Sequence, residues 1–132
     1  MLDKKIADLL NEQVNKEFYS AYLYLDFANY YADEGLDGFA NWYQVQAQEE
    51  RDHAMMMRRY LIDNGVRVTF SKISKPDKTY KKHSDALEFG LEHEQFVTAS
   101  IAEIYAAANE LKDFKTKSRA KRKRMPTISS KR

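Results

Sequence analysis

The stretch WYQVQAQEERDHAMMMRRYL, residues 42–61, decides the fold that this chain is expected to adopt. In and around it, the residues that share one face recur in alternating steps of three and four, the spacing of neighbours on a helix surface. The positions on this stripe are Leu36, Phe39, Tyr43, Gln46, Glu50, His53, Met57 and Tyr60. The pattern predicts a helix over residues 37–64 that turns this face toward the interior of a helix bundle.

Two further helices are predicted on either side of this stretch. Residues 2–32 carry a similar stripe and end before Gly35, a residue that suits the left-handed end of a helix. Residues 84–114 carry a third stripe, with Ser84 as the expected N-cap. The whole chain has only four glycines and two prolines, which favours helix throughout. The sequence therefore predicts an all-α protein.

The connection between the second and third helices is long enough to cross the whole bundle. Residues 66–82 contain β-branched residues, Pro76 and many lysines, so an extended segment is expected. An extended segment of this length spans about 56 Å, whereas the helix before it is about 42 Å long. The third helix is therefore expected to run parallel to the second, as in bundles with a single long crossover.

Four polar residues interrupt these stripes near the middle of their helices. They are Glu17 in the first helix, Glu50 and His53 in the second, and Glu94 in the third. Burying an ionised carboxylate without a partner is costly, and three carboxylates at one level of a bundle repel each other. A pair of divalent metal ions removes this cost, and glutamate oxygens with one imidazole suit iron or manganese. One Glu from each of two helices with Glu-x-x-His from another is the pattern of a di-metal carboxylate site.

Each of these residues also has an ordinary structural interpretation. A lone histidine on an apolar face is usually a core residue with a hydrogen-bond partner. Polar residues nevertheless interrupt the apolar stripes of three separate helices at the same level of the bundle, which favours the metal site. Tyr24 lies on the same face as Glu17 and is either an amphipathic core residue or a contact of the site. His83 and His93 lie off the stripes and are expected to be solvated.

The two parts of the chain carry opposite charge. Lys and Arg number 22 and Asp and Glu number 20, so the net charge is +2. Nine of the basic residues and none of the acids lie in residues 115–132, which leaves a net charge of −7 in residues 1–114. The only apolar side chains in the basic part besides Pro126 are Ala120, Met125 and Ile128. These are too few for an amphipathic helix, and Pro126 discourages one further.

Several classes of protein are excluded or disfavoured by composition. There is no apolar run long enough to span a membrane, and residues 1–10 lack the basic start and apolar block expected of a signal peptide. The absence of cysteine excludes disulfide and thiol chemistry and fits a cytoplasmic protein. The run from Lys121 to Arg124 admits an alternative function in binding nucleic acid or an anionic membrane. The basic segment has no aromatic residues to stack bases, so this alternative is less favoured than the metal site.

Together, these segments resemble bacterial non-haem ferritins. The resemblance extends from Met1 to about Thr116 and rests on three motifs. These are LNEQVNKEFYSAYLYLDFANYY at 10–31, the stretch at 42–61 with its EERDHA core, and LEHEQFVTASI at 91–101. The resemblance implies a ferroxidase centre that binds two Fe(II), passes electrons to dioxygen or peroxide, and releases Fe(III) to a mineral store. It further implies a hollow cytoplasmic shell of twenty-four identical subunits.

The resemblance also implies roles for single residues. Glu17, Glu50, His53 and Glu94 would be iron ligands, with Glu50 bridging the two ions. Haem-binding relatives place Met directly after the ligand Glu, where this chain has Arg51, so no haem is expected.

The ending KTKSRAKRKRMPTISSKR, residues 115–132, departs from the family pattern. Ferritins supply further ligands from a fourth helix at this point, and this ending looks truncated or out of frame. The expected organisation is therefore an incomplete ferritin-like domain over 1–116, a disordered basic tail over 117–132, and a missing or degenerate fourth helix. An inactive fragment is the alternative to a working ferroxidase.

Overall fold

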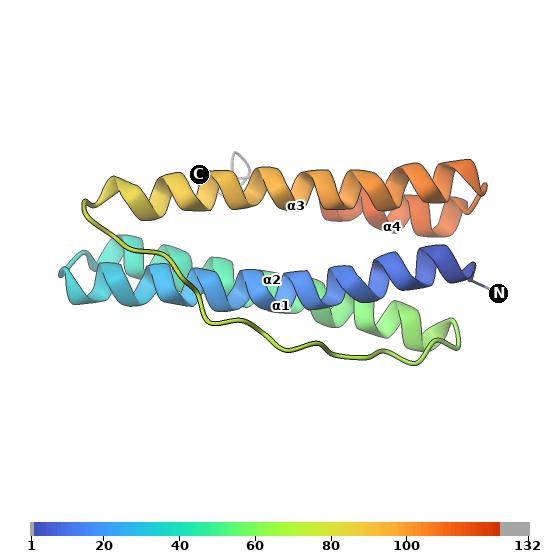
Figure 1. Ribbon diagram of the computed structural model, residues 1–132, viewed down its shortest axis with the longest axis horizontal. Coiled ribbons are helices and arrows are strands. Elements are labelled where there is room, and N and C mark those ends of the chain that lie inside the picture. The colour runs from blue at the N-terminus through green and yellow to red at the C-terminus, as the bar shows by residue number, and fades with distance from the viewer. Residues whose placement is uncertain (1, 125–132) are drawn as a thin grey trace.

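Four helices make up the part of the chain that the computed structural model describes, which is residues 2–124, with side chains as far as Ala120. Their bounds are α1 (Lys4–Asp33), α2 (Asp37–Asp63), α3 (Ser84–Glu110) and α4 (Phe114–Arg124). Figure 1 shows α1 and α2 in one layer of the bundle and α3 and α4 in the other. The all-α class and the first three predicted helices are confirmed, except that α3 ends at Glu110 rather than at residue 114, before a turn in which Lys112 has a left-handed φ of 57°. None of these four helices has both the length and the apolar character needed to cross a membrane.

The crossover runs along the length of the bundle. Residues 64–83 contain neither helix nor strand and lead from the end of α2 back to the start of α3, so that α2 and α3 are parallel (Figure 1). Asn11 of α1 donates from Nδ2 to the Thr69 carbonyl oxygen at 3.1 Å and accepts from the Thr69 N–H at 2.9 Å. Asn15 accepts from the Ser71 N–H at 2.8 Å. The predicted crossover is confirmed, and two asparagines hold it against α1.

Local chemistry sets where the helices end and begin. Gly35, just after α1, has a φ of 76°, a left-handed conformation that favours glycine. Ser84 is the first residue of α3 rather than its N-cap, which corrects the expectation from sequence. Asp85 stabilises the turn before α3, because its carboxylate accepts hydrogen bonds from the N–H groups of Lys81 and Lys82 at 2.8 and 3.1 Å. These donors hold the pKa of Asp85 below its ordinary value.

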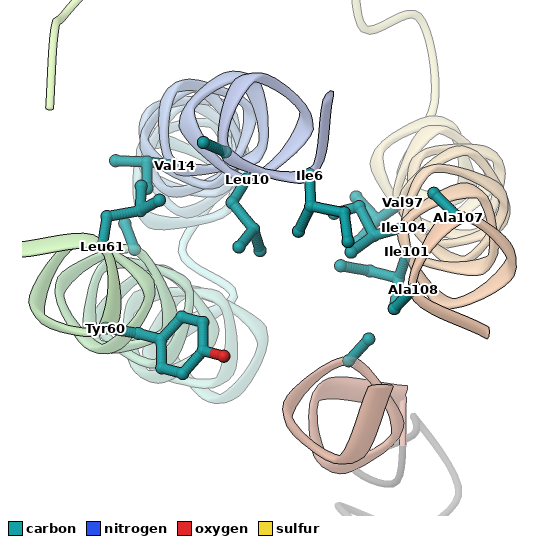
Figure 2. Close-up of a cluster of buried hydrophobic side chains, with 13 residues drawn as sticks. Ile6, Leu10, Val14, Tyr60, Leu61, Val97, Ile101, Ile104, Ala107 and Ala108 are labelled. Atoms are coloured by element: carbon teal, nitrogen blue, oxygen red, sulfur yellow. The ribbon is translucent and has the colours of Figure 1, made fainter. Parts of the chain in front are cut away.

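Two clusters of buried apolar side chains form the core, one toward each end of the bundle. Figure 2 shows the first cluster, in which side chains of α1, α2 and α3 point toward a common centre. Its labelled members are Ile6, Leu10, Val14, Tyr60, Leu61, Val97, Ile101, Ile104, Ala107 and Ala108. The second cluster is rich in aromatic rings and contains Leu23, Tyr24, Phe27, Ala28, Tyr31, Tyr43, Ala47 and Ala86. The clusters leave the middle of α1 and α2 free for polar residues.

The structure contains a short fourth helix, which the sequence was expected to lack. Asp113 starts α4, because its carboxylate accepts from the N–H of Thr116 at 3.0 Å and from the Thr116 hydroxyl at 2.7 Å. Thr116 also shares a 2.8 Å hydrogen bond with the Tyr60 hydroxyl, and Ala120 packs into the first core cluster. The Asp113 cap and the small inward residues Thr116 and Ala120 thus hold α4 in place without the apolar stripe that the prediction required.

The basic residues of α4 contribute to this packing. Lys115 and Arg119 lie over the ring of Tyr60, with their charged groups 5.5 and 5.0 Å from its centroid. The predicted tail therefore forms helix from residue 117 to 124, while residues 125–132 lie outside the described part of the chain. The predicted domain boundary at residue 116 falls within α4 and stays a prediction, as does the truncated or out-of-frame ending.

Replacing Asp113 with Ala tests the cap of α4. We expect the free energy of unfolding to fall by about 1 kcal/mol, since an N-cap carboxylate satisfies backbone donors that the first turn leaves open. The amide hydrogens of α4 should exchange with solvent faster, as measured by hydrogen–deuterium exchange. Glu110→Ala, at an exposed acid just before the same turn, is the matched control and should leave exchange in α4 unchanged.

A second prediction concerns Gly90 of α3, which the side chain of Tyr43 reaches from α2. A Cβ atom at Gly90 would lie 2.6 Å from the Tyr43 hydroxyl oxygen, and Tyr43 is buried among aromatic rings. Gly90→Ala should therefore lower the free energy of unfolding in urea by about 1–3 kcal/mol. In a Tyr43→Phe background the oxygen is gone, and the same substitution should stabilise the protein by up to about 1 kcal/mol through helix propensity. Equal effects in both backgrounds would contradict the contact.

Candidate metal centre

Three of the four predicted ligands meet between the two core clusters. One donor atom each from Glu17, Glu50 and His53 lie within 4.8 Å of one another. The Nδ1 atom of His53 is 3.7 Å from Glu50 Oε1, which follows from their spacing of three residues on α2. Glu17 reaches the same point from α1. The antiparallel pairing of α1 and α2 therefore builds the group without help from α3.

Burial makes this group unusual. Glu17 is 0% exposed and Glu50 is 2% exposed, and the His53 side chain is mostly buried as well. Val14 and Leu23 flank Glu17 along the buried side of α1, and Ala47 and Ala54 flank Glu50 along that of α2. Two buried carboxylates at this separation repel each other when both are ionised, and the low polarity around them strengthens that repulsion.

A glutamine supports the group from within α1. Gln13 is 1% exposed, and its Nε2 donates to Glu17 Oε2 at 2.7 Å. This bond fixes one carboxylate oxygen and orients the other toward the group. Gln46 is likewise buried and stands four residues before Glu50, as Gln13 stands four before Glu17. The repeated Gln-x-x-x-Glu spacing was a signal in the sequence that the analysis of the stripes alone missed.

Glu94 lies apart from these three residues and is bonded to Tyr24. Its Oε1 accepts from the Tyr24 hydroxyl at 2.5 Å. Burial raises the pKa of Tyr24 far above its ordinary value, and the charge and hydrogen bond of Glu94 and the charge of Glu50 raise it further. Tyr24 thus stays protonated and donates. Tyr24 is also a buried member of the second core cluster, so both interpretations of this residue stay predictions, as does Glu94 as a ligand.

His93, expected to be solvated, is half-buried and hydrogen-bonded. Its Nε2 is 2.6 Å from the Ser20 hydroxyl oxygen, whose own proton goes to the Lys16 carbonyl oxygen at 2.9 Å. The imidazole ring of His93 also packs against the rings of Tyr19 and Tyr24. His93 therefore joins α3 to α1, and the sequence pattern missed it because it lies beside the apolar stripe rather than on it. His83 is exposed, as expected, and pairs with Glu34 at 3.1 Å.

The donor set fits a divalent metal ion. Two carboxylates and one imidazole are ligands that iron, manganese and zinc accept. The Nδ1 atom of His53 is buried and makes no hydrogen bond within the described residues, as expected of a nitrogen that is available for a metal. A cation placed among the three groups would also reverse the repulsion between the carboxylates. The arrangement is therefore competent to bind metal.

Comparison with known proteins places this chain in a family. The family described as Ferritin-like domain matches residues 7–121. The chain is 39% identical to the bacterial non-heme ferritin of Staphylococcus saprophyticus over 116 aligned residues. The aligned region covers 88% of this chain and 70% of that protein. The corresponding protein of Campylobacter jejuni is 37% identical with the same coverage.

Solved structures show the same likeness in three dimensions. The open pore ferritin of Archaeoglobus fulgidus is 40% identical with a TM-score of 0.87, covering 92% of this chain and 75% of that chain. Chlorobium tepidum ferritin is 33% identical with a TM-score of 0.88, covering 92% and 74%. The family match covers most of the chain, and the identities exceed what fold alone would require. The chain therefore belongs to the bacterial non-haem ferritin family.

Proposed function

We propose that this protein binds Fe(II) at Glu17, Glu50 and His53, oxidises it to Fe(III), and stores the product as mineral. The observation that carries the proposal is the convergence of three buried donor groups from α1 and α2 within 4.8 Å. Oxygen-rich ligands with one imidazole suit iron in both oxidation states. Iron is the substrate here, and the protein holds it at a site that water reaches poorly.

The proposed roles divide between binding and support. Glu50, whose Oε1 lies 3.7 Å from His53 Nδ1, is the proposed bridge between two iron ions. Glu94, held by Tyr24, is the proposed additional ligand from α3. Two Fe(II) ions give up one electron each, and these two electrons with two protons reduce one dioxygen to hydrogen peroxide. Hydrogen peroxide itself is the alternative electron acceptor, and no haem takes part in the proposed reaction.

Assembly into a shell is part of the same proposal. The relatives that this chain matches are named as ferritins, and the family builds hollow oligomeric shells in which iron is kept. We propose that copies of this chain assemble in the same way in the cytoplasm, with the mineral on the inside. The exposed apolar side chains of the single chain, among them Tyr22, Leu25, Val45 and Met56, are available for such contacts.

The first test removes the proposed bridging ligand. In Glu50→Gln, we expect Fe(III) formation after oxygen is admitted to anaerobically loaded protein to slow by more than about tenfold, the size of effect seen for lesser changes around metal ligands. Absorbance of Fe(III) follows the reaction, and anaerobic titration gives the Fe(II) stoichiometry. Glu92→Gln, at an exposed acid of α3, is the matched control and should behave as the unaltered protein.

Equal stoichiometry and equal rates in Glu50→Gln and Glu92→Gln would reject the proposed site. Tight Fe(II) binding without oxidation in the unaltered protein would identify a binding site that lacks the groups needed for turnover, and so would support the inactive alternative.

The second test concerns stability without metal. Removing one charge from the buried pair should raise the free energy of unfolding of metal-free Glu50→Gln by about 1 kcal/mol at neutral pH, because the repulsion from Glu17 is relieved. Mn²⁺, which has similar ligand preferences and resists oxidation, should stabilise the unaltered protein by about 2.7 kcal/mol at a hundredfold excess over its dissociation constant. Urea unfolding with and without Mn²⁺ measures both effects. A loss of stability in metal-free Glu50→Gln would show that Glu50 serves packing instead.

A further inference from the structure

An apolar groove of about 800 Å³ lies at the end of the bundle that α4 does not cover. Figure 1 shows α4 alongside only the C-terminal part of α3, near the start of α1. Toward the opposite end, the N-terminal parts of α2 and α3 line the groove together with Tyr24 of α1. Phe39, Leu87 and Leu91 are 47%, 40% and 52% exposed there. An unusually large apolar surface therefore faces solvent in the single chain.

Aromatic side chains form much of the wall of this groove. Phe39, Trp42 and Tyr43 follow one another along α2, and all three line the groove. On the α3 side of the groove, the Tyr43 hydroxyl packs against Gly90, where a Cβ atom would lie 2.6 Å from its oxygen. The groove thus offers an apolar body a surface lined with aromatic rings, which also attract a positive charge.

The charged residues that line the groove are of one sign. They are Asp37 at the outer end, where α2 begins, and Glu94 at the inner end, and no basic residue is among the described lining residues. Glu94 is half-buried and is held by the Tyr24 hydroxyl, whereas Asp37 is exposed to solvent. A cation gains more from the half-buried carboxylate, because water screens an exposed one.

We propose that this groove binds amphipathic cations, molecules with an apolar body and an ammonium group, and that Glu94 receives the ammonium group. The apolar body lies along Trp42 and Leu91, where its burial provides most of the affinity. The carboxylate at the inner end and the surrounding aromatic rings select the cationic head group over neutral and anionic ones. Two features of the groove support this occupant: the single sign of the lining charges and the aromatic wall beside them.

This binding is separable from iron binding at the triad. Glu17, Glu50 and His53 do not line the groove. Glu94 is the one residue that both proposals use, so metal-free protein is the proper material for the test. Glu17→Gln should abolish Fe(II) binding at the triad and leave binding of the cation unchanged, which distinguishes failure of one proposal from failure of the other.

The experiment compares three probes that share one alkyl chain: decylammonium, decanol and decanoate, each below the concentration at which it forms micelles. Trp42 is the only tryptophan of the chain and lines the groove, so its fluorescence reports binding directly. We expect decylammonium to bind saturably and about tenfold more tightly than decanol, which is the size of effect of a charged hydrogen bond. Decanoate should bind more weakly than decanol. Glu94→Gln should bring decylammonium to the affinity of decanol, and Asp37→Asn, the matched control, should change it less than twofold.

Three results would overturn the proposal. Equal affinity for all three probes would show a surface that is merely apolar. An equal loss in Glu94→Gln and Asp37→Asn would show that the inner carboxylate does not receive the head group. Trp42 fluorescence that changes on dilution without any probe would show that a second copy of the chain already covers the groove.

Discussion

The repulsion between two buried carboxylates is the constraint on which this structure depends. Glu17 and Glu50 are almost fully enclosed and come from facing helices, so neither can turn away into water. Apolar clusters lie on both sides of these two carboxylates, and Gln13 holds Glu17 in place through a hydrogen bond. Such a site is poorly stable when empty and strongly favours a cation, and this preference is the physical basis of its proposed function.

Helical periodicity explains why so much was predictable. The steps of three and four placed Glu17, Glu50 and His53 on the inward faces of their helices, and the structure puts them together. Periodicity does not determine what a side chain bonds to, so the pairing of Glu94 with Tyr24 was not foreseen. The same limit applies to His93, which reaches Ser20 from the margin of its stripe.

Helix α4 shows a different limit of the sequence pattern. An amphipathic stripe was taken as the requirement for a helix, yet α4 is anchored by the side chain of Asp113, by Thr116 and by Ala120. Charged side chains that lie over Tyr60 add to this anchoring, although they would be counted as solvated in any hydropathy pattern. Within residues 2–124, α4 lies at one end of the bundle only, and α1, α2 and α3 alone form the other end.

The placement of the triad within α1 and α2 has a consequence for the order of folding. A turn of three residues joins these helices, whereas α3 is joined to them through the long crossover, so closing the α1–α2 hairpin costs far less chain entropy. The hairpin is therefore the natural first unit to form, with α3 and α4 docking afterwards. It already carries Glu17, Glu50 and His53, so a metal ion can enter before the second layer closes over it.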